Sequence, residues 1–260
     1  RGLIPDQDPA ELPRTDGHGR VRIVHTAADE ATTVTGLLRD GRIEIMPFDS
    51  CRVDVRATAD SLQLRRVDLW RASLRAELTG ATDTAEVFTG DLALAVEDLR
   101  DLPAEWQWPA LTGRARGRVG VTGPVEDLDV SGALTLHDPT LGPMGAAAGE
   151  ATLVGEDVLG DDWRVSAAIG GGGFSAGGVP LGDYLLWLRG DATSVAVDSF
   201  RTVRGDTVTT VHGRADFLAD VADLEADRLA IGFAGTTWRI DGPVRARLGD
   251  GVVQLPELLL

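Results

Sequence analysis

The chain has 260 residues, with 25 basic and 41 acidic side chains, which gives a formal net charge of −16 at pH 7. Such a chain repels polyanions, because binding to nucleic acid requires a basic surface that releases counterions from the phosphates. No nucleic acid partner is therefore expected. Hydrophobic residues make up 43% of the chain, which is enough apolar surface to offset the entropy cost of folding and excludes a disordered polyanion.

Residues that serve many active sites are missing from the sequence. It contains neither lysine nor asparagine, which excludes a P-loop lysine, a Schiff-base lysine, a Ser-x-x-Lys pair and an Asn-linked glycosylation site. Cys51 is the only cysteine, so the chain can form neither an intrachain disulfide nor a zinc site of several thiolates. We expect no metal, no cofactor and no catalytic residue.

The first 17 residues differ from the rest of the chain. Pro5, Pro9 and Pro13 recur at intervals of four, which favours extended backbone over helix. We interpret residues 1–17 as a linker or covering arm and residues 18–260 as one continuous repeating β-segment. Because the chain begins at Arg1 and ends in three leucines, we expect it to be an internal piece of a longer protein.

From Gly19 onward, apolar and polar residues alternate with a period of two. Val21 and Ile23, for example, are interleaved with Arg20 and Arg22. This alternation is typical of half-buried strands, and its recurrence predicts roughly 16 to 18 of them. Asp-Gly pairs at residues 40–41 and 250–251 are the dipeptides of tight hairpin turns. The sequence therefore predicts an all-β fold: an elongated, curled, mostly antiparallel sheet that forms a U-shaped groove with an apolar interior.

Two segments interrupt this pattern. Residues 99–108 are compatible with one helical turn, which Pro103 would end. Residues 165–182 carry no charge over 18 positions but contain seven glycines and Pro180. Each glycine would cost a helix roughly 1 kcal/mol and the proline more, so we do not expect a membrane-spanning helix there.

A G-x-S-x-G motif occurs at residues 173–177, Gly-Phe-Ser-Ala-Gly. A nucleophile elbow needs a strand before the serine and a helix directly after it. Here glycines precede Ser175, and Gly-Gly-Val-Pro follows Ala176, so we expect a glycine-rich loop. The overlapping Gly171-x-Gly173-x-x-Ala176 resembles a dinucleotide fingerprint and fails for the same reason.

Several segments resemble the recurrent units of the TamB/AsmA-like family. Residues 111–142, LTGRARGRVGVTGPVEDLDVSGALTLHDPTLG, contain a Leu-x-Gly opening, a strand, a turn at Gly123-Pro124 and a strand with Ser-Gly. Residues 236–260, TTWRIDGPVRARLGDGVVQLPELLL, place a tryptophan strand, Gly-Pro and a short hairpin before a leucine-rich strand. Residues 53–80 and 90–103 fit the same pattern, so the resemblance covers nearly everything after residue 18.

The resemblance implies a role in lipid transport. Members of this family are anchored in the inner membrane of diderm bacteria, and their curled sheet forms an apolar groove associated with phospholipid transport toward the outer membrane. The chain is accordingly expected to be a periplasmic segment of such a protein and to contact phospholipid acyl chains. Its parent protein would supply an inner-membrane anchor and contact an outer-membrane β-barrel of the assembly-factor type. The chain itself shows neither the family's N-terminal anchor nor its C-terminal insertion domain.

A groove of this kind needs only a dry aliphatic lining for acyl chains and a polar outer surface. The predicted lining residues share one parity within their strands. They are Val21, Ile23, Val53, Val55, Leu92, Leu94, Val119, Val121, Leu134, Leu136, Leu229, Ile231, Phe233 and Ile240.

Two other classes of protein remain open. In a structural or adhesive β-solenoid or β-sandwich at the cell surface, the same apolar face would pack against other strands of the protein. An enzyme would instead bring polar residues together on the apolar face.

Overall fold

The computed structural model describes residues 15–28, 30–43, 46–102, 111–124, 127–158, 162–191, 195–218, 221–233, 235–249 and 252–254. Beyond residue 213, the structure describes the backbone of most of these residues but the side chains of only a few.

The described residues form a single 17-stranded sheet and one 3-10 helix. The strands are β1 (Thr15–Thr26), β2 (Ala31–Ile43), β3 (Met46–Ala57), β4 (Leu62–Arg71), β5 (Leu74–Thr82), β6 (Val87–Val96), β7 (Leu111–Pro124), β8 (Asp129–Leu141), β9 (Met144–Gly145), β10 (Ala148–Glu156), β11 (Arg164–Ala176), β12 (Val179–Asp191), β13 (Val195–Arg204), β14 (Thr207–Leu218), β15 (Val221–Phe233), β16 (Thr236–Gly249) and β17 (Val252–Gln254). The helix η1 (Leu99–Asp101) lies between β6 and β7.

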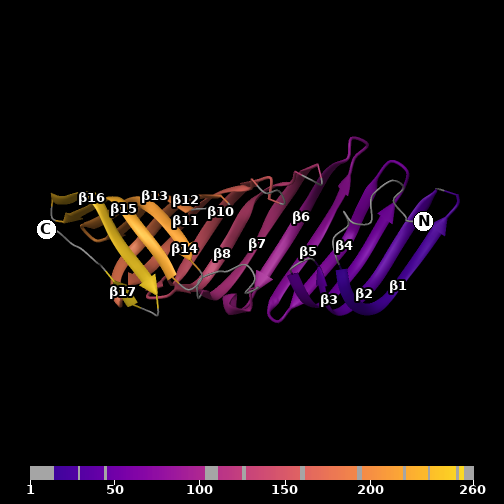
Figure 1. Ribbon diagram of the computed structural model, residues 1–260, viewed down its shortest axis with the longest axis horizontal. Coiled ribbons are helices and arrows are strands. Elements are labelled where there is room, and N and C mark those ends of the chain that lie inside the picture. The colour runs from indigo at the N-terminus through magenta and orange to yellow at the C-terminus, as the bar shows by residue number, and fades with distance from the viewer. Residues whose placement is uncertain are drawn as a thin grey trace.

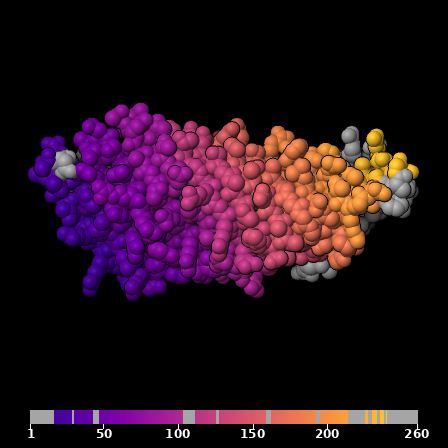
Figure 2. Space-filling view, turned by 180° about the vertical axis from the view of Figure 1, so that it is seen from behind, coloured from indigo at the N-terminus to yellow at the C-terminus, as the bar shows by residue number. Residues whose placement is uncertain are grey.

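Strands that follow one another in the sequence are neighbours in the sheet, and all of the described pairings are antiparallel. The short β9 and β10 occupy the same place in the sheet, between β8 and β11. β9 pairs with the end of β8 on one side and with the end of β11 on the other. Figure 1 shows the resulting long, curled sheet, with β1 at one end and β17 at the other. Figure 2 shows the same elongated body from behind. The predicted all-β, elongated, curled and antiparallel fold is confirmed.

The two faces of the sheet differ in burial. In β10, Gly149, Ala151 and Gly155 are buried, whereas the residues of opposite parity are exposed. We call the face that carries these buried positions the inner face and the opposite one the outer face. A period-two sequence produces this asymmetry, because successive side chains of a strand point to opposite faces.

The prediction of a hairpin turn at Asp40-Gly41 is wrong. Both residues lie within β2, and Gly41 pairs with Phe48 while Ile43 pairs with Met46. Asp40 has a φ of 46°, so this dipeptide introduces a left-handed irregularity into the strand rather than a chain reversal. The second predicted turn, Asp250-Gly251, lies outside the described residues, although Gly249 and Val252 pair directly across it.

Two further expectations concern segment boundaries. Of the predicted arm, residues 1–14 lie outside the described part of the chain, and β1 already begins at Thr15. Within residues 99–108, the structure contains η1, whose N-cap Asp98 accepts a hydrogen bond from the backbone N–H of Arg100. The segment after Leu102 lies outside the described residues as far as position 110.

The glycine-rich segment is a strand rather than the loop we expected. Residues 170–176 belong to β11, where a Cβ added at Gly171 would lie 2.1 Å from the carbonyl oxygen of Ala148. Glycine at this position therefore allows two strands to approach closely. No helix among the described residues is long and apolar enough to cross a membrane.

Candidate functional site

The antiparallel register aligns inner-face residues into rows that run across the strands. Row B contains Val21, Gly36, Val53, Val67, Leu78, Leu92, Val119, Gly132, Leu153, Ala167, Leu188, Val197, Gly213 and Ala226. Every member is apolar or glycine. The row extends from β1 to β15 without a polar side chain.

Two parallel rows flank row B, and they are also apolar. Row A contains Ile23, Val34, Val55, Leu64, Gly80, Gly90, Val121, Val130, Gly155, Val165, Gly190 and Val195. Row C contains Gly19, Leu38, Cys51, Leu69, Ala76, Leu94, Gly117, Leu134, Ala151, Ile169, Leu186, Phe200 and Val211. We refer to rows A, B and C together as the apolar strip.

The register brings the predicted lining residues together on the inner face. Val21, Val53, Leu92 and Val119 lie in row B; Ile23, Val55 and Val121 lie in row A; Leu94 and Leu134 lie in row C. Leu136 and Ile231 belong to a fourth row, described below. Leu229 pairs with Val211 and Ile240, and Phe233 pairs with Thr236, but the side chains of Leu229, Phe233 and Ile240 lie outside the described part.

The glycines of the apolar strip were not among the predicted lining residues. Gly80 and Gly90 lie opposite each other in row A, and the Phe88 ring covers both, because a Cβ at either position would lie within 2.7 Å of it. Glycine thus makes room for a neighbouring aromatic ring on the inner face. The signal was present in the sequence, since these glycines occupy the same strand parity as the apolar residues.

The fourth row, row D, is partly covered at its N-terminal end. It contains Arg71, Leu74, Val96, Ala115, Leu136, Gly149, Gly171, Tyr184, Thr202, Thr209 and Ile231. Leu99 of η1 joins a buried cluster with row C and row D residues, including Cys51, Leu74 and Val96, and Leu102 packs against this cluster.

Polar contacts hold η1 in this position. The Ser73 backbone N–H donates to Asp101 Oδ2 at 3.1 Å, and the Asp98 backbone N–H donates to Ser73 Oγ at 2.9 Å. The helix therefore closes part of the inner face between β3 and β7. Burial also raises the pKa of the Cys51 thiol.

An aromatic group occupies the inner face at β11–β13. The Phe174 ring lies 5.4 Å from the Tyr184 ring and 5.1 Å from the Phe200 ring, measured between centroids. These distances are typical of favourable aromatic pairs. Beside them lies Thr202, one of two buried polar residues in the described part of the chain. Burial raises the pKa of Tyr184, whose hydroxyl donates to the carbonyl oxygen of Ala148 at 3.5 Å.

Charged side chains are arranged on the outer face. Arg66 Nε donates to both carboxylate oxygens of the buried Asp68 at 2.8 and 2.7 Å, and Arg66 also donates to Glu77 at 3.0 Å. Arg52 lies 4.0 Å from the same Asp68 carboxylate and 6.0 Å from the Trp70 ring centroid. These contacts connect β3, β4 and β5 across the surface that faces away from the apolar strip.

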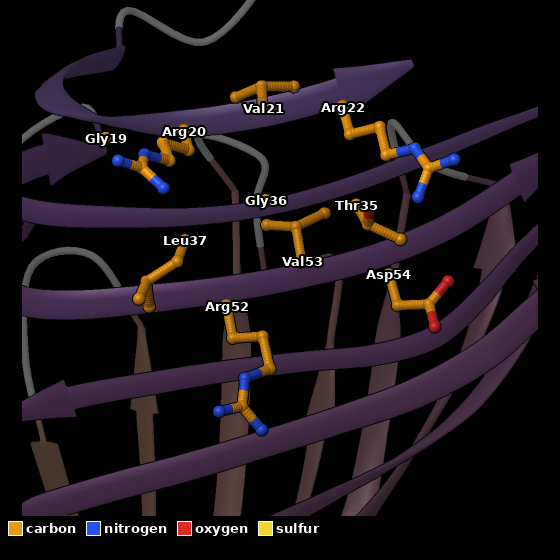
Figure 3. A pocket seen from close by; sticks show the side chains of 10 residues that line it. All are labelled: Gly19, Arg20, Val21, Arg22, Thr35, Gly36, Leu37, Arg52, Val53 and Asp54. Carbon is orange, nitrogen blue, oxygen red and sulfur yellow. The ribbon is translucent and has the colours of Figure 1, made fainter. Parts of the chain in front are cut away.

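A pocket of about 730 Å³ lies beside this network and is lined by residues of β1, β2 and β3. Its outer-face lining consists of two rows in the register: Arg20, Leu37 and Arg52 in one, and Arg22, Thr35 and Asp54 in the other. Figure 3 shows these two groups on either side of Gly36. Oδ1 of Asp54 is buried and has no hydrogen-bond partner among the described residues. The pocket therefore combines three guanidinium groups with one carboxylate.

Ser175 does not lie on a nucleophile elbow. Ser175 pairs with Pro180 and Gly145 within the sheet, and a two-glycine turn rather than a helix follows β11. The described His, Cys, Asp and Glu side chains form no group of three or more that could hold a metal ion.

Comparisons of the chain with protein families, with characterised proteins and with solved structures find no match.

Proposed function

We propose that the chain is a segment of a lipid-transfer protein, in which the apolar strip conducts phospholipid acyl chains between two membranes of a cell envelope. The observation that carries this proposal is the continuity of the strip: three adjacent rows contain no charged side chain from β1 to β13. With strands about 4.8 Å apart, row B extends for about 60 Å, and three rows spaced by two residues span about 13 Å. This size suits extended acyl chains.

The charged side chains of the outer face are compatible with lipid transfer. Acyl chains require an apolar surface that excludes water, whereas a head group has to remain solvated. Ion pairs such as Arg66–Glu77 and Arg189–Asp198 lie on the outer face, where they keep a long single sheet soluble. The proposed location is the periplasm, with anchoring and membrane contacts supplied by other parts of a longer protein. No catalytic step is proposed, because transfer along a groove breaks no covalent bond.

Lipid binding is tested on the chain purified without detergent. Organic extraction and mass spectrometry should recover phospholipid. Transfer of a fluorescent phospholipid between vesicles should accelerate when the protein is added.

The decisive variants are Leu134→Asp and Thr135→Asp. Leu134 lies in row C and is half-buried, whereas Thr135 follows it on the outer face and is exposed. A charge in a dry groove costs several kcal/mol, so Leu134→Asp should reduce transfer by at least tenfold and Thr135→Asp should leave it within twofold. Lipid-free protein, or equal losses from the two variants, would favour a structural or adhesive protein instead.

A further inference from the structure

The apolar strip is continuous in residue type but not in exposure. Its row A and row B members on β2 and β3 are half-buried, and so are Ala167 on β11 and Leu188 on β12. On β7, by contrast, Val121 of row A is 9% exposed and Val119 of row B is 7% exposed, and Ala115 of the adjoining row D is 4% exposed. The inner face is therefore closed at β7 and more open on either side of it.

Phe88 closes row A in this section. It lies on β6 and is 6% exposed, and its ring covers Gly80 and Gly90, because a Cβ at either position would lie within 2.7 Å of it. Val121 pairs with Gly90 across the β6–β7 ladder. An aromatic ring of the protein thus occupies the space over row A that an acyl chain would need.

Helix η1 closes rows C and D from the other side. Leu99 is 6% exposed and belongs to one buried cluster with Cys51 of row C and with Leu74 and Val96 of row D. Cys51 and Val96 are each only 1% exposed. Leu99 therefore fills the place where an acyl chain would contact these rows.

The attachment of η1 to the sheet is small. The helix is a single turn of three residues. The Asp98 backbone N–H donates to Ser73 Oγ at 2.9 Å, and the Ser73 backbone N–H donates to Asp101 Oδ2 at 3.1 Å. Ser73 lies in the turn between β4 and β5, so breaking these contacts leaves the strand ladders intact. A unit of this size can open locally without unfolding the sheet.

We propose that η1 is a gate on the apolar strip, which covers rows C and D in the lipid-free chain and moves away when an acyl chain passes β6 and β7. This inference deepens the proposed lipid transfer and rests on it, because a permanently closed section would stop an acyl chain partway along the strip. The arriving chain would replace Leu99 against Cys51, Leu74 and Val96, so these side chains would stay out of water. Because the acyl chain binds only the open arrangement, lipid shifts the population toward it.

Cys51 provides a measure of gate opening that does not depend on lipid transfer. It is the only cysteine, and burial both restricts access to its thiol and raises its pKa, which slows its reaction with a maleimide. Labelling by N-ethylmaleimide, followed by mass spectrometry, should be about 100-fold slower in the native chain than in the urea-unfolded chain. At low urea the rate should hardly change with urea concentration, because opening one helical turn exposes little surface.

Two variants weaken the gate without altering the apolar strip. Ser73→Ala removes the acceptor of the Asp98 N–H, and Asp101→Ala removes the acceptor of the Ser73 N–H. Each should raise the rate of Cys51 labelling about fivefold and the rate of phospholipid transfer between vesicles about threefold, as expected for the loss of one hydrogen bond. Ser61→Ala is the matched control, because Ser61 is exposed in the turn at the opposite end of β4. It should change neither rate appreciably.

The outcomes separate the gate from lipid transfer itself. If the unaltered chain transfers no phospholipid, the proposed function fails and the gate fails with it. If the unaltered chain transfers phospholipid but the two variants label faster without transferring faster, η1 is not a gate and lipid transfer stands. Unchanged labelling in both variants, rapid labelling of the native chain, or a labelling rate that follows global unfolding in urea would also overturn the gate and leave lipid transfer intact.

Discussion

Val21 and Val119 are the same residue type in the same row of the same sheet, yet Val21 is 55% exposed and Val119 is 7% exposed. Val21 belongs to β1, which pairs only with β2 among the described strands, whereas Val119 lies on β7, between β6 and β8 and near the section that η1 covers. Alternation in the sequence therefore fixes the face on which a residue lies. The depth to which it is buried depends on how many strands and segments surround it.

A charge introduced at Val119 should lower the stability of the fold far more than the same charge at Val21. Val119→Asp should destabilise the fold by about 4 kcal/mol, or prevent folding, because an unpaired carboxylate would replace a buried isopropyl group. Val21→Asp should cost less than about 1 kcal/mol, since most of the side chain already contacts water. Urea unfolding followed by circular dichroism measures both. Similar losses for the two variants would contradict the assigned burial.

The cover provided by η1 is tested by Leu99→Ala. Leu99 is 6% exposed and contacts the buried cluster of the covered section, so its truncation should cost about 3 kcal/mol through lost burial and a residual cavity. Leu62→Ala is the control, because Leu62 is 36% exposed at the start of β4. Its midpoint of unfolding should shift much less. An unchanged midpoint in Leu99→Ala would show that the helix contributes little to the covered section.

Two glycines of the sheet, Gly90 and Gly120, also differ in how closely their neighbours approach them. A Cβ at Gly90 would lie 2.5 Å from the carbonyl oxygen of Thr79 and 2.7 Å from the Phe88 ring, whereas at Gly120 its nearest neighbour would be 3.6 Å away. Gly90→Ala should therefore destabilise the protein by about 1–3 kcal/mol through overpacking. Gly120→Ala should be close to neutral. Thermal denaturation of the two variants, measured side by side, distinguishes them.

The smallest expected effect concerns pH. Hydrogen bonds from Arg189, at 2.7 and 2.6 Å, hold the pKa of Asp198 below its ordinary value of 3.8. A lowered folded-state pKa stabilises the fold above the ordinary value, and this stabilisation is lost as the pH falls through the lowered pKa. The pair is largely exposed, so it should contribute less than about 1 kcal/mol. An NMR titration should show the Asp198 pKa rising in Arg189→Gln; a fall would contradict the assigned pairing.

Much of the candidate site could be predicted from the sequence, for a physical reason. Because strand side chains alternate between faces, the parity of Val53, Leu94 or Val121 within its own strand is enough to group it with the others. Turn positions were less predictable: Asp40-Gly41 has the composition of a hairpin turn, but the observed register of β2 and β3 places the reversal beyond Ile43. Local propensity did not decide between the two positions, whereas the pairing of whole strands did.

The sequence by itself determined the fold class, the alternation of two faces and the absence of lysine, asparagine and cysteine-pair chemistry, because these depend on residue type and local spacing alone. Only the tertiary structure decided that the apolar positions of separate strands meet in three unbroken rows, that glycines make room for Phe88, and that Leu99 covers one section of the inner face. It also decided that Val21 and Ile23 are exposed on β1, whereas Val119 in the same strip is buried on β7. These features depend on register and on contacts between residues far apart in the chain, which no local pattern encodes.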